Sequence, residues 1–234
     1  MAHLALWSFL LLAGTQLALG RPQGSDSPPE LILKPGCSES AMFRCVSPVI
    51  SFVMSADGQR LMKIRKSGAI QQPDFEKACR LAGTTAGCMN TWIKKCVPED
   101  AGHDLHILGQ GTVDLLNVCN EPTSFDEFKK FASCAEKMNT TMKSCGEELR
   151  AKMPKTSGEF NHETPKRILS RQNLQRDFCC SIQKYNDCYR PNMQNVCGSD
   201  GVAVTTKLHN RILSSYKCTD DVLSFCANSI ANAA

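Results

Sequence analysis

The amino-acid sequence predicts an all-α protein, stapled by disulfides and built from two related six-cysteine repeats. Three observations lead to this fold class. Apolar residues recur every three or four positions, strand-like alternation is rare, and the chain contains 14 cysteines. Aromatic residues make up only 6% of the chain, so bulky side chains contribute little core. Disulfides, each worth about 2–4 kcal/mol, are expected to compensate.

The N-terminal segment has the features of a secretory signal peptide. Residues 1–20 contain no charged side chain, and their apolar run over 4–13 is shorter than the ~20 residues that span a bilayer. Small residues at Ala18 and Gly20 indicate cleavage after Gly20. We therefore expect a flexible leader over 21–36 and a secreted, extracellular chain. No later segment is long and apolar enough to suggest a membrane span.

All the cysteines follow the predicted signal peptide, as expected for folding in an oxidising compartment. Because their number is even, we expect every cysteine to be paired. Zinc binding is the alternative, but the sequence lacks the C-x2-C spacing typical of zinc sites. The expected disulfide cysteines are Cys37, Cys45, Cys79, Cys88, Cys96, Cys119, Cys134, Cys145, Cys179, Cys180, Cys188, Cys197, Cys218 and Cys226.

The cysteine spacing repeats about 100 residues further along the chain. Six cysteines match six others in order, with offsets of 97, 100, 100, 100, 101 and 99. This agreement indicates an internal duplication, with a first repeat over 37–123 and a second over 124–234. The matched cysteines are Cys37 and Cys134, Cys45 and Cys145, Cys79 and Cys179, Cys88 and Cys188, Cys96 and Cys197, and Cys119 and Cys218.

Two cysteines of the second repeat have no counterpart in the first. Cys180 corresponds to Arg80, and Cys226 corresponds to Asp126. The simplest inference is that Cys180 pairs with Cys226. Within each set of six, many connectivities are possible, and the sequence does not choose among them.

Helical periodicity covers both repeats. Asp74 is the expected N-cap of a helix that runs to Cys96. Ser124 and Glu127 form a capping box, S-x-x-E, and inward-facing residues continue from there to Leu149. Further helices are expected over 174–185 and 208–216, and from an N-cap at Thr219 to Ile230. The one strand candidate is 202–206.

The sequence offers no recognisable catalytic motif. It lacks G-x-S-x-G, and Gly109-Gln110-Gly111 lacks the third glycine and the Lys-Ser/Thr of a phosphate loop. The double cysteine Cys179-Cys180 is shared with secreted phospholipase A2, but 181–184 lack the His-Asp pair which that enzyme needs. We therefore expect no enzyme, no catalytic residues and no cofactor.

The histidines define the remaining alternative, a secreted hydrolase. It would need one histidine to share a cleft with a carboxylate or a serine. His103 and His106 flank Asp104 and could be imagined as metal ligands. A solvated loop with Asp104 as an N-cap is the favoured interpretation, so no metal is expected. The histidines of the mature chain are His103, His106, His162 and His209.

Charge and modification signals complete the pattern. The net charge is +4 with Lys and Arg scattered, so the basic patch of a nucleic-acid binder is not expected. Asn139-Thr140-Thr141 is a glycosylation sequon, and we predict a glycan on Asn139. The dibasic Lys166-Arg167 is better explained as a solvated helix start after Pro165 than as a processing site.

Apolar residues on the predicted helices suggest one kind of binding site. Met138 and Met142 lie on the same face as the phenylalanines; methionine can line an adaptable apolar cavity, but it is more often part of an ordinary core. A cavity between the two repeats, lined by Met and Phe, would hold a small hydrophobic ligand.

Several stretches resemble one known family. They are L-L-N-V-C and F-D-E-F-K-K-F within 115–131, C-A-E-K-M-N-T-T-M-K-S-C-G over 134–146, and F-C-C, C-Y, N-V-C and Y-K-C after 178. With the signal peptide, length and sequon, the chain resembles the arthropod 27 kDa haemolymph glycoproteins. The resemblance implies a secreted, mostly helical glycoprotein of body fluid, without catalytic residues. The expected function is binding of an extracellular protein partner or a small apolar ligand.

Overall fold

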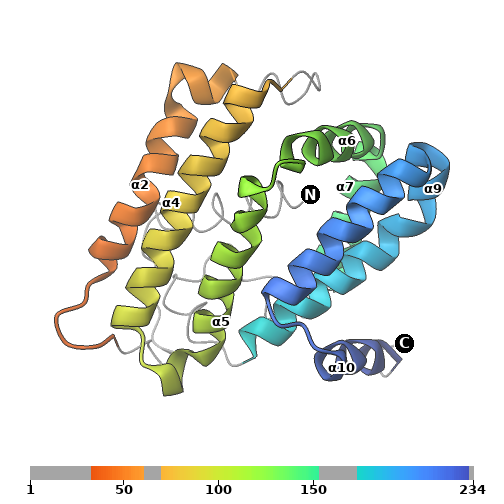
Figure 1. Cartoon of the computed structure of the whole chain (residues 1–234). Helices are drawn as coiled ribbons and strands as arrows, with labels where there is room; N and C mark the ends of the chain where they lie inside the picture. The colour runs from red at the N-terminus through yellow and green to blue at the C-terminus, as the bar shows by residue number, and fades with distance from the viewer. Residues whose placement is uncertain (1–32, 61–69, 153–172, 232–234) are drawn as a thin grey trace.

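The computed structural model describes residues 33–60, 70–152 and 173–231, which are mostly helical (Figure 1). The predicted signal peptide, His162 and Lys166-Arg167 lie outside the described residues. The all-α prediction is confirmed, since the described residues contain no strand. The helices are α2 (Glu39–Met54), α4 (Gln72–Cys96), α5 (Glu99–Leu116), the 3-10 helix η1 (Asn117–Asn120), α6 (Ser124–Lys137), α7 (Asn139–Lys152), α9 (Leu174–Ser215) and α10 (Asp220–Ala231).

The longest element, α9, is a hairpin of two helical limbs. Gly198 has φ +66° and ψ −174°, a conformation open to glycine and rarely adopted by other residues, and the chain reverses there (Figure 1). Contacts between Gln183 and His209, and between the rings of Phe178 and Tyr216, join limb 174–197 to limb 199–215 and to its C-cap residue, Tyr216. The strand predicted at 202–206 is wrong, because those residues belong to the second limb.

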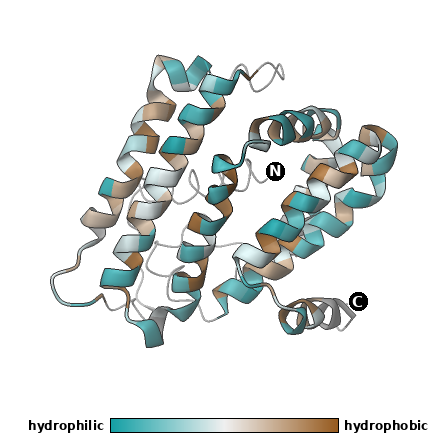
Figure 2. Cartoon of the chain, viewed as in Figure 1, coloured by the Kyte–Doolittle hydropathy of each residue, from teal (hydrophilic) through white to brown (hydrophobic). Residues whose placement is uncertain are grey.

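The helices group into two sets: α2, α4 and α5, with η1 after them, form the first, and α6, α7, α9 and α10 form the second. In the first set, α4 packs against both α2 and α5. In the second set, α7 packs against the α9 hairpin. The two sets meet where α5 packs against α9, so α5 lies between α4 and α9 (Figure 1). Figure 2 shows hydrophobic residues along α5 and on α9, the two helices that make this central contact.

Both sets of six cysteines bond in the same order: first with fifth, second with fourth and third with sixth. This is what the predicted duplication requires, although the duplication itself stays an inference from the spacing. The seventh bond joins Cys180 to Cys226, the pairing predicted from the sequence. The other bonds are Cys37–Cys96, Cys45–Cys88, Cys79–Cys119, Cys134–Cys197, Cys145–Cys188 and Cys179–Cys218.

Two predicted helix starts are corrected by the structure. Asp74 is in the first turn of α4 rather than at its N-cap, because the helix already begins at Gln72, and proline fits a first turn. Its carboxylate is paired with Arg60 at 2.8 Å. The cap of α6 is Thr123, whose hydroxyl donates a hydrogen bond to Glu127 Oε1 at 2.9 Å, and not Ser124.

The single helix predicted from Ser124 to Leu149 is two helices. Met138 separates α6 from α7 with φ −89° and ψ 4°, outside the helical range. The side chain of Met138 is almost completely buried against Cys134 and Tyr189 in the core of the second set. The apolar periodicity therefore continues across a turn at which the helix direction changes.

Two glycines of α5 allow the helices on its two sides to come close. A Cβ on Gly109 would lie 2.9 Å from Ile93 Cδ1 of α4. A Cβ on Gly111 would lie 2.6 Å from the carbonyl oxygen of Ser215 and 2.7 Å from Tyr216 Cδ1. The Gly109-Gln110-Gly111 stretch therefore serves helix packing, with one glycine facing each neighbour.

Candidate functional site

A half-open pocket of about 110 Å³ lies where the two sets of helices meet. Its walls come from α4, the end of α5 and η1 in the first set, and from α6 and the second limb of α9 in the other. The lining is mostly apolar, and polar groups gather on the α6 and α9 side. The pocket therefore combines helices that are distant in the sequence.

The α4 wall consists of one helical face. Phe75, Ala78, Cys79 and Ala82 recur every three or four residues and line the pocket together. The two alanines have short side chains, which leaves space between α4 and the opposite wall. The disulfide from Cys79 to Cys119 ties α4 to η1, so a covalent bond holds two walls of the pocket at a set distance.

The α6 wall contributes aromatic rings. Phe128 and Phe131 line the pocket, and Phe131 is buried. The ring of Phe75 lies 5.1 Å from that of Phe128 and 5.6 Å from that of Phe125, centroid to centroid, within the range of favourable aromatic pairs. These contacts fix α4 against α6 on one side of the pocket.

The second limb of α9 brings two cations to the same pocket. Lys207 and Arg211 are four residues apart, so they follow one another on the same face of the limb. Lys207 forms an ion pair with Glu127 of α6, and Arg211 forms one with Glu121, which follows η1. The hydrogen bond from Lys207 holds the pKa of the Glu127 carboxyl below its ordinary value.

The two methionines considered for a cavity wall lie in the core, which is the more common place for methionine. Met138 and Met142 pack with Tyr189 and Met193 in the core of the second set. The phenylalanines do line the pocket. The apolar periodicity places both the methionines and the phenylalanines on inward faces. It does not distinguish the pocket wall from the core, because the helix direction changes at Met138, between α6 and α7.

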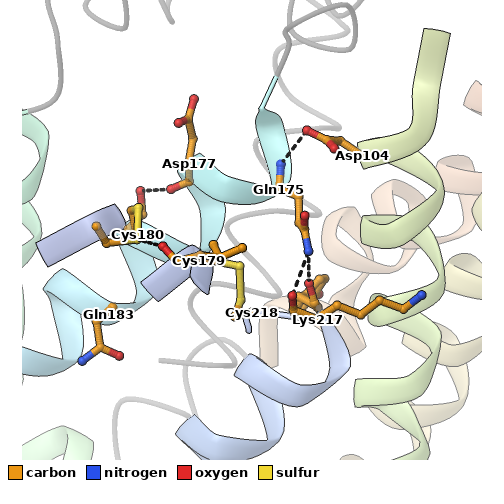
Figure 3. The surroundings of a disulfide bond; sticks show 12 residues. Asp104, Gln175, Asp177, Cys179, Cys180, Gln183, Lys217 and Cys218 are labelled. Carbon is orange, nitrogen blue, oxygen red and sulfur yellow. Dashed lines mark hydrogen bonds between the residues drawn. A yellow bond between two sulfur atoms is a disulfide. The ribbon is translucent and has the colours of Figure 1, made fainter. Parts of the chain in front are cut away.

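The sequence suggests Asp104 as an N-cap, but Asp104 lies within α5. Its carboxylate accepts a hydrogen bond from the backbone N–H of Gln175, at the start of α9, with an N–O distance of 3.1 Å (Figure 3). The side-chain amide of Gln175 donates to the carbonyl oxygens of Tyr216 and Lys217, beside the Cys179–Cys218 disulfide (Figure 3). These residues join the two sets of helices rather than forming a reactive cluster.

Two of the three described histidines, His106 and His209, contact amide-type oxygens. His106 Nε2 lies 3.1 Å from the carbonyl oxygen of Val97, and His103 is exposed. His209 donates to Gln183 Oε1 at 3.3 Å, and the Gln183 amide donates to Asp187. Burial is the main cause that lowers the pKa of His209. Within 33–60, 70–152 and 173–231, no group of three or more His, Cys, Asp or Glu side chains could hold a metal ion.

The sequon residue Asn139 is exposed at the first position of α7. Its glycosylation stays a prediction. Among the helices that the structure describes, none is long and apolar enough to cross a membrane. Comparison of the chain with protein-family models, with curated proteins and with solved structures gave no match.

Proposed function

We propose that the protein is a secreted, non-enzymatic binding protein of an extracellular fluid. Its ligand is a small apolar molecule, or the apolar end of a larger one, held between α4, η1, α6 and α9. The pocket with its phenylalanine and alanine walls is the observation that carries this proposal. Apolar pockets with a few polar groups at one side are the usual form of small-molecule sites.

The size of the pocket supports a small ligand group. An apolar protein cavity of about 150 Å³ holds a benzene molecule. The pocket here has about 110 Å³ and is open on one side, so it suits one small ring or a short alkyl segment. A larger ligand would extend through the opening.

The construction of the walls supports binding without large rearrangement. The Cys79–Cys119 bond links α4 to η1, and the Phe75–Phe128 contact links α4 to α6. A pocket that is already formed loses little conformational entropy when the ligand enters. A disulfide-stapled pocket would also suit an extracellular carrier, which must keep its shape without cellular chaperones.

Secretion and the non-enzymatic role are supported by separate observations. The predicted signal peptide, the seven disulfides and the sequon at Asn139 support an extracellular location, as does the resemblance to haemolymph glycoproteins. The contacts of His106 and His209 with amide-type oxygens favour a binding role over hydrolysis. An expected haemolymph location remains part of the proposal.

The first test fills the pocket. Ala82→Leu places a larger side chain on the α4 wall, whereas Ala203→Leu adds the same atoms at an exposed position of α9. We expect a neutral fluorescent probe, N-phenyl-1-naphthylamine, to place its phenyl ring in the pocket and its naphthyl group in the opening, and to bind the natural protein and the Ala203→Leu variant equally. The Ala82→Leu variant should bind at least tenfold more weakly. Equal binding by a correctly folded Ala82→Leu protein would contradict the proposal.

The second test examines protein purified from its own source. Native mass spectrometry should show an additional mass that disappears when the protein is unfolded. A single mass equal to the glycosylated chain alone would count against a carrier function. The same spectrum reports whether Asn139 carries a glycan.

A further inference from the structure

The polar side of the pocket has a specific arrangement of charges. Lys207 and Arg211 stand one helical turn apart on α9, each in an ion pair with a glutamate from another segment. The side chains of Arg211 and Glu127 are 27% and 25% exposed, so they are half-buried at the edge of an apolar pocket. A polar group on a bound ligand could therefore reach these charged side chains from the pocket.

Both cations have hydrogen-bonding capacity beyond these pairs. An ammonium group carries three N–H donors and a guanidinium group carries five. Glu127 takes one donor of Lys207, and Glu121 takes one donor of Arg211. The position of the cations beside the apolar lining suggests that they recognise the polar end of the ligand.

We propose that the ligand is an amphipathic carboxylic acid, and this inference rests on the proposed function. Its apolar end lies among Phe75, Phe128 and Phe131, and its carboxylate binds Lys207 and Arg211. Two carboxylate oxygens match two cations placed one turn apart. Charge-assisted hydrogen bonds are about twice as strong as neutral ones, so an acid is favoured over an alcohol of the same shape. An amine would find Glu127, the one carboxylate of the pocket lining, already paired with Lys207, and it would be repelled by both cations.

The two glutamates compete with the ligand for the cations. Glu127 holds Lys207 in the free protein, so the bound carboxylate must share or replace this contact. Removing the charge of Glu127 therefore tightens the binding of an acid. If Glu127 only supported the structure, its removal would leave binding unchanged or weaken it, so the direction of the effect distinguishes the two roles.

The experiment compares three ligands with one tail: 3-phenylpropionate, 3-phenylpropanol and 3-phenylpropylammonium. Calorimetry on the full secreted chain at pH 7.4 gives each affinity. We expect the acid to bind at least tenfold tighter than the alcohol, a factor that corresponds to about 1.4 kcal/mol. The amine should bind more weakly than the alcohol. Equal affinity of acid and alcohol would overturn the inference.

Variants of Lys207 and Glu127, which line the pocket, give the second readout. Lys207→Gln should weaken binding of the acid about tenfold and leave the alcohol unchanged, while Lys207→Arg should retain the acid. Glu127→Gln should tighten the acid alone. Asp126→Asn is the matched control, because Asp126 pairs with Lys129 on the same helix without lining this pocket. Thermal unfolding checks that each variant is folded.

The outcomes separate this inference from the proposed function. If acid and alcohol bind equally, and Ala82→Leu weakens both, the pocket is correct and the ligand class is wrong. If none of the three ligands binds, the acid inference is overturned. The neutral naphthylamine probe then decides whether the pocket proposal falls as well. An acid that binds equally well to the Lys207→Gln and natural proteins would also contradict the inference.

Discussion

The carboxylate of Asp104 accepts a hydrogen bond from the backbone N–H of Gln175, 71 positions later in the chain. Asp104 belongs to α5 and Gln175 to the first turn of α9. The N-cap residue of α9, Asn173, has a left-handed backbone (φ +66°) and makes no capping bond with its side chain. A residue of the first set of helices therefore caps the longest helix of the second set.

Replacement of Asp104 should destabilise the contact between the two sets. Loss of a capping acceptor costs about 0.5–2 kcal/mol, and a carboxylate also interacts favourably with a helix N-terminus. We expect Asp104→Ala to lose about 1 kcal/mol in urea unfolding. Asp104→Asn keeps an acceptor and should lose less. If both variants unfold like the natural protein, the cap makes no contribution.

Replacing two helical glycines by alanine should have opposite effects on stability, because Gly111 lies where α5 approaches α9 and Gly87 of α4 faces open space. Gly111→Ala would place a Cβ 2.6 Å from the Ser215 carbonyl oxygen, and we expect a loss of about 1–3 kcal/mol. Gly87→Ala meets no atom within 4 Å and should gain up to about 1 kcal/mol from helix propensity. Thermal unfolding measures both. A Gly111→Ala variant as stable as the natural protein would show that the helices can move apart without cost.

The disulfide without a counterpart in the first repeat should control α10. Cys180 and Cys226 are 46 positions apart in the sequence, and the bond ties α10 to α9. We expect the double variant Cys180→Ser/Cys226→Ser to lose about 2–4 kcal/mol. Hydrogen exchange should accelerate in α10 while α4 keeps its protection. Uniform acceleration throughout the chain would instead mean that this bond supports the whole fold.

Thr85 offers a site for stabilisation. Its hydroxyl is buried without a hydrogen-bond partner among the described residues, and the residue is 1% exposed. A buried, unpaired polar group costs free energy, and valine has nearly the same shape. We expect Thr85→Val to raise the midpoint of thermal unfolding or leave it unchanged, whereas Thr85→Ala should lower it through the cavity. A lower midpoint for valine would indicate that the hydroxyl has a partner.

His209 predicts how stability depends on pH. Burial lowers its pKa in the folded protein, opposed by the nearby Asp187 and assisted by Arg190. The unfolded chain therefore takes up a proton first, near the ordinary histidine pKa of about 6.5. Stability should fall as the pH drops from about 6.5 to the lowered folded value. His209→Gln should reduce this dependence in urea unfolding. The same pH dependence of stability in the natural protein and the His209→Gln variant would contradict the role assigned to His209.

Local patterns were enough to predict the helical face of α4 and the extra disulfide, but they did not predict α2, and they assigned 202–206 of α9 to a strand. Helical periodicity depends on residues three or four positions apart, so the face that runs from Phe75 to Cys96 could be recognised in the sequence. The pairing of Cys180 with Cys226 followed from counting, since each lacks a counterpart. The break at Met138 could not be predicted, because the apolar pattern continues through it.

The candidate site was predicted only in outline. A cavity between the repeats lined by phenylalanine and methionine was considered; phenylalanines line the pocket, whereas Met138 and Met142 belong to the core, the interpretation favoured for them from the sequence. Lys207 and Arg211 were taken as part of the scattered surface charge. No local pattern distinguishes them from other lysines and arginines, because their position beside the pocket depends on the packing of α9 against α6.

By itself, the sequence determined the all-α class and the pairing of the two extra cysteines. It also presented two sets of six cysteines in matching order. Only the tertiary structure decided which cysteines of each set bond, where α9 reverses at Gly198, and which side chains surround the pocket. The physical reason is the range of the interactions. Helix formation depends on near neighbours along the chain, whereas a disulfide partner or a pocket wall depends on residues brought together only when the helices pack.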